Sequence, residues 1–212
     1  MRFHTIPAFL AAACLLIACT ACQSVPYSNR SQFMLTSVSY ENEQGAEAWK
    51  EILKTEKLST NQTAVNALNR VGPRIAEASA QKDFQWEFKV IESEQANAFC
   101  LPGGKVALYT GILPYMDNDA EMAVVIGHEV SHAIARHGGE RMSQGYIQNA
   151  GAAVVSVLMS DSAYKDLAVS AYGITTNLAG ILPYSRLHES EADKIGMMLM
   201  AKAGYDPNYA IA

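Results

Sequence analysis

The sequence predicts an α+β fold that is mostly helical, with a small antiparallel sheet beside one central buried helix. Several segments have the apolar spacing of helices, three short segments have strand character, and one helix is apolar on nearly every side. With 212 residues, 50% of them hydrophobic, the chain is long enough for one ordinary domain with a real core. Its formal net charge of -5 argues against nucleic-acid binding, which normally needs a basic surface.

Residues 1–22 resemble a bacterial lipoprotein signal peptide. Arg2 and His4 precede an apolar run without acidic residues, and this run is too short to span a membrane. Small residues follow it, together with Cys19 and Cys22, either of which is a candidate for acylation. We therefore expect a lipid anchor, in the outer membrane of a bacterial cell envelope, with the folded domain in the periplasm. A plain secretory signal cleaved nearby is the alternative.

The next segment, residues 23–40, is rich in serine and carries a single charge, at Arg30. This composition predicts a tether of about 20 residues, spanning roughly 25 Å if it is flexible. If lipid occupies Cys19 or Cys22, only Cys100 remains in the folded domain. We then expect no disulfide within the domain, although the compartment would permit one.

Residues 41–212 are predicted to form one domain that opens with two core-covering helices. Apolar residues fall on one face of 45–57. A second helix is expected to start near Ser59, which has capping-box spacing to Gln62. Gly72 and Pro73 should kink or split this helix.

The sheet is predicted from three short segments. Residues 84–90 alternate between apolar and polar side chains, which is typical of a half-buried strand. Two further strands, 96–101 and 105–110, flank Pro102-Gly103-Gly104, which is typical of a tight hairpin turn.

The central helix is expected over about 118–137, ended by Gly138-Gly139, and is apolar nearly all round. Two uncharged stretches follow, 142–160 and 167–185. Each is near membrane-spanning length, but their polar residues and glycines favour a buried or interfacial helical pair over insertion. A last helix is expected over about 186–203.

The central helix carries an H-E-x-x-H motif from His128 to His132. Residues four apart lie about 40° apart on a helix, so both imidazoles can share one metal. Glu129 lies about 100° round, where a general base for a metal-bound water is needed. Chance would produce the motif in about one such chain in a hundred, so a metal site is favoured over two ordinary core histidines.

A catalytic zinc needs a third protein ligand and an open position for water. The last helix offers Glu189 and Glu191, which are about 200° apart around the helix axis. Asp193 shares the face of Glu189, so this pair can supply one metal ligand and one carboxylate that orients a ligating histidine. We therefore expect one Zn²⁺ per chain on His128, His132 and Glu189, with Asp193 behind a histidine. Glu191 is expected to be a surface or ion-pairing residue.

Two further histidines are expected to be structural. His137 comes nine residues after His128, which on a continuous helix is half a turn away from the metal face. His188 faces about 100° away from the predicted ligand Glu189.

Three segments resemble the zinc peptidase family that contains HtpX, the CAAX prenyl protease and the mitochondrial inner-membrane stress protease. They are Asn-Ala-Phe-Cys-Leu-Pro-Gly-Gly at 97–104, Ile-Gly-His-Glu-Val-Ser-His at 126–132, and Tyr-Ser-Arg with Glu-Ser-Glu-Ala-Asp within 184–193. The resemblance covers roughly 84–207. It is greatest to the periplasmic lipoprotein-type members and to the catalytic domain of the mitochondrial protease.

This resemblance implies a gluzincin-like metallopeptidase with the zinc ligands named above and Glu129 as the catalytic base. It also implies that Asn97, Ala98 and Phe99 border the active-site cleft, so that extended substrate pairs antiparallel to this strand. Cys100 in the same strand is expected to be a small buried hydrophobe. Family members usually continue beyond the position of Ala212, so we expect the domain to be incomplete at its C-terminus and assign no oxyanion-stabilising residue.

The expected activity is zinc-dependent cleavage of misfolded or unfolded envelope polypeptides. One alternative is a metal-containing chaperone that holds such proteins without cutting them. Another is a latent protease whose region 142–185 plugs the cleft until a partner moves it. The presence of Glu129 argues against a pure binder, which has no need of a base there.

Overall fold

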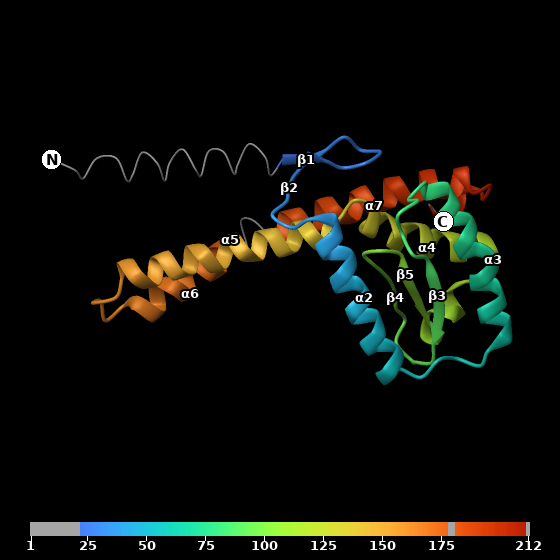
Figure 1. The fold of residues 1–212 in the computed structure, drawn as a ribbon, viewed down its shortest axis with the longest axis horizontal. Coiled ribbons are helices and arrows are strands. Elements are labelled where there is room, and N and C mark those ends of the chain that lie inside the picture. Colours follow the sequence, from blue (N-terminus) through green and yellow to red (C-terminus); the bar gives the residue numbers. More distant parts are fainter. Residues whose placement is uncertain (1–21, 178–180, 211–212) are drawn as a thin grey trace.

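The computed structural model describes residues 22–177 and 181–210, and the predicted signal peptide, including Cys19, lies outside them except for Cys22. The mostly helical α+β class is confirmed. The elements, drawn in Figure 1, are β1 (Cys22–Ser24), β2 (Ser31–Phe33), α2 (Val38–Thr55), α3 (Gln62–Ser79), β3 (Glu87–Ile91), β4 (Ala98–Leu101), β5 (Lys105–Tyr109), the 3-10 helix η1 (Thr110–Tyr115), α4 (Asp119–Ile134), α5 (His137–Leu158), α6 (Lys165–Thr176), α7 (Leu182–Lys202) and the 3-10 helix η3 (Pro207–Ala210).

The three predicted strands form one sheet in the order β3-β5-β4. β4 and β5 are the antiparallel hairpin that the sequence predicts, and Gly103 and Gly104 have φ of 81° and 86° in its turn. β3 instead pairs parallel with β5, with Phe88 opposite Val106, so the sheet is mixed and not antiparallel. Alternation identifies the faces of a strand but not the direction of its neighbour. The result leaves β4 at the sheet edge.

Helices cover both faces of this sheet (Figure 1). On one face, Ile75 of α3, Ile126 of α4 and Leu199 of α7 join Leu108 of β5 in the main core. On the other face, Trp49 of α2 packs in a smaller cluster with strand residues. Burial of this apolar surface from both sides holds α4, the motif-bearing helix, against the sheet.

Two glycines allow α4 and α7 to cross closely beside the motif. A Cβ on Gly196 would lie 3.0 Å from the backbone nitrogen of His128, and one on Gly127 would lie 3.2 Å from the carbonyl oxygen of Gly196. Both neighbours are backbone atoms, which cannot turn away as a side chain could. The close crossing brings Glu189 of α7 alongside His128 and His132 of α4.

Replacing Gly196 by Ala is expected to lower the melting temperature by several degrees. Overpacking costs about 1–3 kcal/mol, which outweighs the helix-propensity gain of about 1 kcal/mol. Gly173→Ala in α6 is the matched control because a Cβ there meets nothing within 4 Å. The control should raise the melting temperature by about 2–4 °C. Thermal unfolding followed by circular dichroism measures both, and equal shifts in the two variants would refute the close-crossing explanation.

The segment predicted to be a tether is packed onto the domain. β1 and β2 form an antiparallel hairpin, and Val25 and Met34 are buried, Val25 within the main core. α2 begins at Val38, where the Ser37 side chain accepts a hydrogen bond from the amide of Tyr40. The tether prediction for 23–40 is therefore wrong, because a few apolar side chains suffice to dock a segment that is polar on average.

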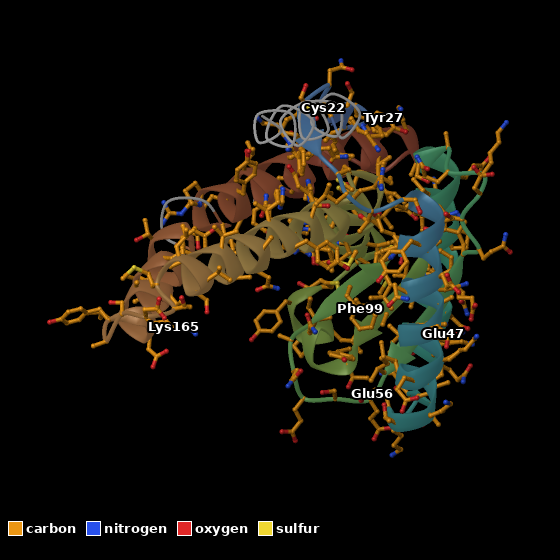
Figure 2. The ribbon with its side chains drawn as sticks, turned by 60° about the vertical axis from the view of Figure 1, so that its left-hand side comes forward. Cys22, Tyr27, Glu47, Glu56, Phe99 and Lys165 are labelled. Carbon is orange, nitrogen blue, oxygen red and sulfur yellow. The ribbon has the colours of Figure 1, made fainter. Side chains whose placement is uncertain are left out.

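The two uncharged stretches form a helical hairpin, α5 and α6, that projects away from the sheet (Figure 1). In Figure 2, Lys165 marks its far end, distant from Phe99. Every residue of α6 in the described part of the chain is at least partly exposed, so a buried pair is not what forms. Among the described residues, no helix is both long enough and apolar enough to cross a membrane.

Candidate metal centre

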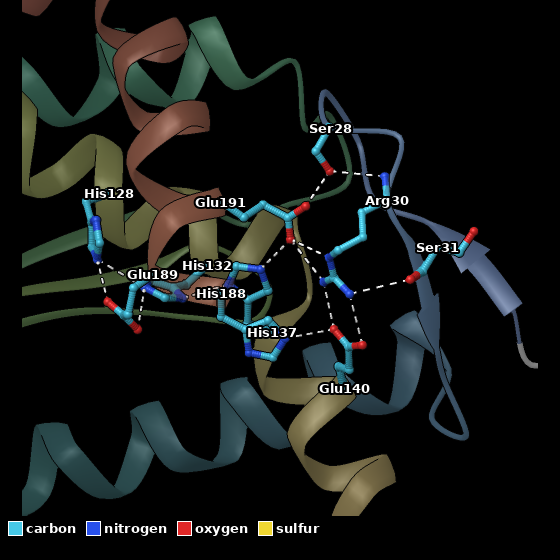
Figure 3. A network of polar contacts seen from close by, with 10 residues as sticks. All are labelled: Ser28, Arg30, Ser31, His128, His132, His137, Glu140, His188, Glu189 and Glu191. Carbon is cyan, nitrogen blue, oxygen red and sulfur yellow. Dashed lines mark hydrogen bonds and ion pairs between the residues drawn. The ribbon is translucent and has the colours of Figure 1, made fainter. Parts of the chain in front are cut away.

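Three side chains converge where α4 crosses α7. His128 and His132 come from adjacent turns of α4, and Glu189 comes from α7 (Figure 3). One ligand atom from each of the three lies within 4.8 Å of the others. The structure thus brings together the three ligands that the sequence predicts.

The spacing of these atoms suits a single zinc ion. The Nε2 atoms of His128 and His132 are 3.1 Å apart, and Glu189 oxygens lie 3.4 Å from the first and 3.7 Å from the second. Tetrahedral ligands with bonds of about 2.0–2.1 Å to a common ion lie about 3.3 Å from one another. Two imidazoles with one carboxylate are also a common ligand set of catalytic zinc, so the residues present fit this metal.

Asp193 occupies the position expected for an orienting carboxylate. Its Oδ1 lies 2.8 Å from Nδ1 of His128, so the carboxylate accepts the Nδ1 proton and leaves Nε2 facing the site. The Glu189 and Asp193 side chains are 57% and 64% exposed. The ligand cluster therefore opens to solvent on the α7 side, which a catalytic site needs.

The electrostatics of the motif suit a metal ligand and a base. Burial, with the charge of His128, lowers the pKa of His132 to about 4, which keeps this imidazole neutral as metal binding requires. Burial raises the pKa of Glu129 to about 7; His128 opposes this rise and Glu189 adds to it. A carboxyl group whose pKa is near neutral can both accept and return a proton.

The comparison with known families agrees with this geometry. A family model described as Peptidase family M48 matches residues 61–212. The chain belongs to peptidase family M48. The match includes the three converging ligands, Glu129 and the edge strand β4, and it confirms the family resemblance that the sequence segments indicated.

Relatives of the chain include proteins named as mitochondrial and proteins from bacteria. The chain is 36% identical over 194 residues to the mitochondrial metalloendopeptidase OMA1 of Schizosaccharomyces pombe, covering 90% of this chain and 56% of that protein. It is 40% identical over 135 residues to the OMA1 of Arabidopsis thaliana, covering 64% of this chain and 26% of that protein. It is 30% identical over 147 residues to the β-barrel assembly-enhancing protease of Yersinia pestis, covering 66% of this chain and 30% of that protein. The chain thus spans between 26% and 56% of the length of these relatives.

His137 contacts the H-E-x-x-H motif, although the sequence predicted that it would face away from the metal ligands. The chain leaves α4 at Ile134, and Arg136 takes a left-handed φ of 58° before α5 begins. This break turns His137 back, so that its Nδ1 lies 2.8 Å from Nδ1 of His132. His137 is fully buried, and burial, with nearby His188 and His132, lowers its pKa to about 3 against its hydrogen bond to Glu191. A neutral His137 can therefore accept the Nδ1 proton of His132.

A buried polar cluster continues outward from His137. Its Nε2 lies 2.9 Å from Glu191, and its ring stacks on His188 with centroids 4.1 Å apart. His188 in turn contacts Glu140 at 2.9 Å. Glu191 was expected to be a surface or ion-pairing residue. It does form an ion pair, with Arg30, but its side chain is buried and not on the surface. The sequence patterns did not single out Glu140. The one signal for this cluster was Arg30, the only charged residue in 23–40, which pairs with both Glu140 and Glu191.

The M48 edge strand β4 presents its residues alternately to the two faces of the sheet. Ala98 is buried in the core shared with α4, whereas Phe99 packs edge-on against Trp49 and Tyr109 on the α2 side. The Phe99 side chain therefore points to the face opposite α4, and Asn97 is exposed. Burial, with the charge of Glu129, raises the pKa of the Cys100 thiol, which favours the protonated and less nucleophilic form.

Proposed function

We propose that this chain is a zinc-dependent metalloendopeptidase in which Glu129 activates water for peptide-bond hydrolysis. The convergence of His128, His132 and Glu189 within 4.8 Å, with Glu129 beside them on α4, carries the proposal. Membership of family M48 and the metalloendopeptidase relatives support it.

The reaction follows from what each side chain can do. A bound zinc would polarise the scissile carbonyl and lower the pKa of water. Glu129 accepts a proton from the attacking water, whose oxygen bonds to the carbonyl carbon. The carbon–nitrogen bond then breaks, and Glu129 passes the proton to the leaving amine. Asp193 holds the His128 ring in one orientation throughout.

For the substrate we propose an extended stretch of an unfolded or misfolded envelope polypeptide. β4 lies at an edge of the sheet, where a substrate strand can add by backbone hydrogen bonds. The Yersinia pestis relative is named for β-barrel assembly, which supports an envelope role for this chain as well. A lipid anchor at Cys19 or Cys22, set in the outer membrane, remains part of this proposal; Cys22 is exposed at the start of β1.

The non-cleaving chaperone and the latent protease are less well supported. A half-buried carboxyl group whose pKa burial raises to about 7 suits proton transfer and has no evident use in a pure binder. The hairpin of α5 and α6 projects away from the sheet, and Glu189 is 57% exposed. These observations favour an accessible catalytic site over a plugged one.

Removal of the metal is expected to abolish cleavage of an unfolded protein such as reduced casein. Without the ion, Glu129 alone cannot supply the stabilisation of transition-state charge that a metal provides. The measurement is casein turnover by the zinc-loaded chain, after treatment with 1,10-phenanthroline, and after zinc is restored. Zinc should restore turnover in full. Cleavage that is insensitive to the chelator would disprove the zinc mechanism, and casein binding without cleavage in all three samples would favour the chaperone.

A further inference from the structure

The segment that carries β1 and β2 reaches the outer hydrogen bonds of the metal centre through Arg30. Its guanidinium donates from Nε to Glu191 at 3.0 Å and from Nη1 and Nη2 to Glu140 at 3.0 and 2.7 Å (Figure 3). Ser28 donates a further hydrogen bond to Glu191. A single arginine, 16% exposed, thus holds two carboxylates that come from α5 and α7.

The hydrogen bonds between the metal site and Arg30 have only one consistent direction. If His132 gives Nε2 to a metal, its proton is on Nδ1 and is donated to Nδ1 of His137. His137 must then carry its own proton on Nε2, which it donates to Glu191. Glu191 accepts this proton as well as those of Arg30. Each link therefore depends on the next one outward for its position.

Arg30 is the cation that Glu191 and Glu140 share. Glu140 and Glu191 are 2% and 5% exposed, and both contact the same guanidinium. Without that cation the two buried carboxylates would repel each other, because little solvent is available to screen them. Glu191 would then move away from Glu140, and His137 would lose the acceptor that orients its ring.

We propose that Arg30 is a positioning residue for the metal ligand His132, acting through Glu191 and His137. The segment 22–33 is then a structural part of the metal centre and not a spacer in front of it. The inference rests on the proposed zinc site. Arg30 precedes the region matched by the M48 model, which begins at residue 61.

The test compares zinc affinity of the full chain and of Arg30→Ala by competition with a chromogenic chelator. Loss of an outer partner of a ligating histidine typically weakens metal binding about 10–100-fold, and we expect a loss of this size. Arg70→Ala is the matched control. Arg70 makes two hydrogen bonds of 2.7 Å to Asp119, and neither residue belongs to the metal cluster or to the Arg30 network. Its zinc affinity should equal that of the unchanged protein.

Two further measurements separate positioning from general damage. The visible spectrum of the cobalt-substituted chain reports ligand geometry and should change in Arg30→Ala but not in Arg70→Ala. In a Glu191→Gln background, which keeps the side-chain shape, Arg30→Ala should weaken zinc binding by much less than it does alone, because both act on one path. Glu191→Gln also serves if Arg30→Ala does not fold, and it should itself weaken zinc binding about 10–100-fold.

The outcomes distinguish this inference from the proposed function. Unchanged zinc affinity in folded Arg30→Ala, or equal losses with and without the Glu191→Gln change, would overturn the positioning role alone. A chain that binds zinc with the expected Arg30 dependence but does not hydrolyse casein would support the inference and refute the peptidase proposal. A chain that does not bind zinc at all would overturn both.

Discussion

Glu129→Gln is expected to reduce kcat for peptide-bond hydrolysis by at least about 10²–10⁴-fold while zinc content stays at one ion per chain. Glutamine has nearly the same shape but cannot take a proton from water. Glu129 is also not among the three converging ligands, so the metal should be retained. The measurements are cleavage of a quenched fluorescent peptide and metal analysis of the same sample.

The control for this substitution is Glu47→Gln on the outer face of α2, where the side chain is 62% exposed. It removes the same charge far from the site and should leave both cleavage and zinc content unchanged. Undiminished hydrolysis by Glu129→Gln would show that another group acts as the base.

Glu189→Ala is expected to remove zinc from the purified chain and hydrolysis with it. Its carboxylate is the only one among the three converging ligands, and two imidazoles alone leave an incomplete site. Asp193→Asn should weaken zinc binding by only about 10–100-fold, because it replaces the charged acceptor that orients His128 and leaves the three ligands in place. Glu189→Ala should weaken zinc binding by more than this. Zinc titration of the apo-proteins by chelator competition ranks the variants.

Glu191 supplies the discriminating comparison, since it lies two residues from Glu189 on the same helix. Glu191→Gln should weaken zinc binding less than Glu189→Ala, because Glu191 acts only through His137. If the Glu191 change removed zinc and Glu189→Ala kept it, the assignment of the third ligand would be wrong.

Much of the metal centre was predictable because it depends on the regular geometry of two helices. The four-residue spacing of His128 and His132 puts both on one face whatever the helix packs against. The same spacing links Glu189 with Asp193, and the structure places these residues where that reasoning indicated. The β4–β5 hairpin was predictable for a similar reason, since its turn residues and strands are adjacent in sequence.

The predictions that failed concern chain reversals and distant partners. On one continuous helix, residues five apart lie about 140° apart, so His137 should face away from His132. The left-handed conformation of Arg136 ends that helix and reverses the relation. Glu41 pairs with Arg136 at 2.7 Å, and this contact comes from α2, nearly a hundred residues earlier. The residues next to Arg136 in the sequence do not indicate this partner.

The residue order was therefore enough to indicate the family and to predict which side chains converge, because both depend on residue types at fixed spacings within single elements. Three features could be seen only in the folded chain: β3 runs parallel to β5, residues 22–33 are docked on the domain, and Arg30 ends a chain of contacts that starts at His132. These features depend on which distant segments pack together. Packing is decided by the burial of the whole core and not by the residues of either segment alone.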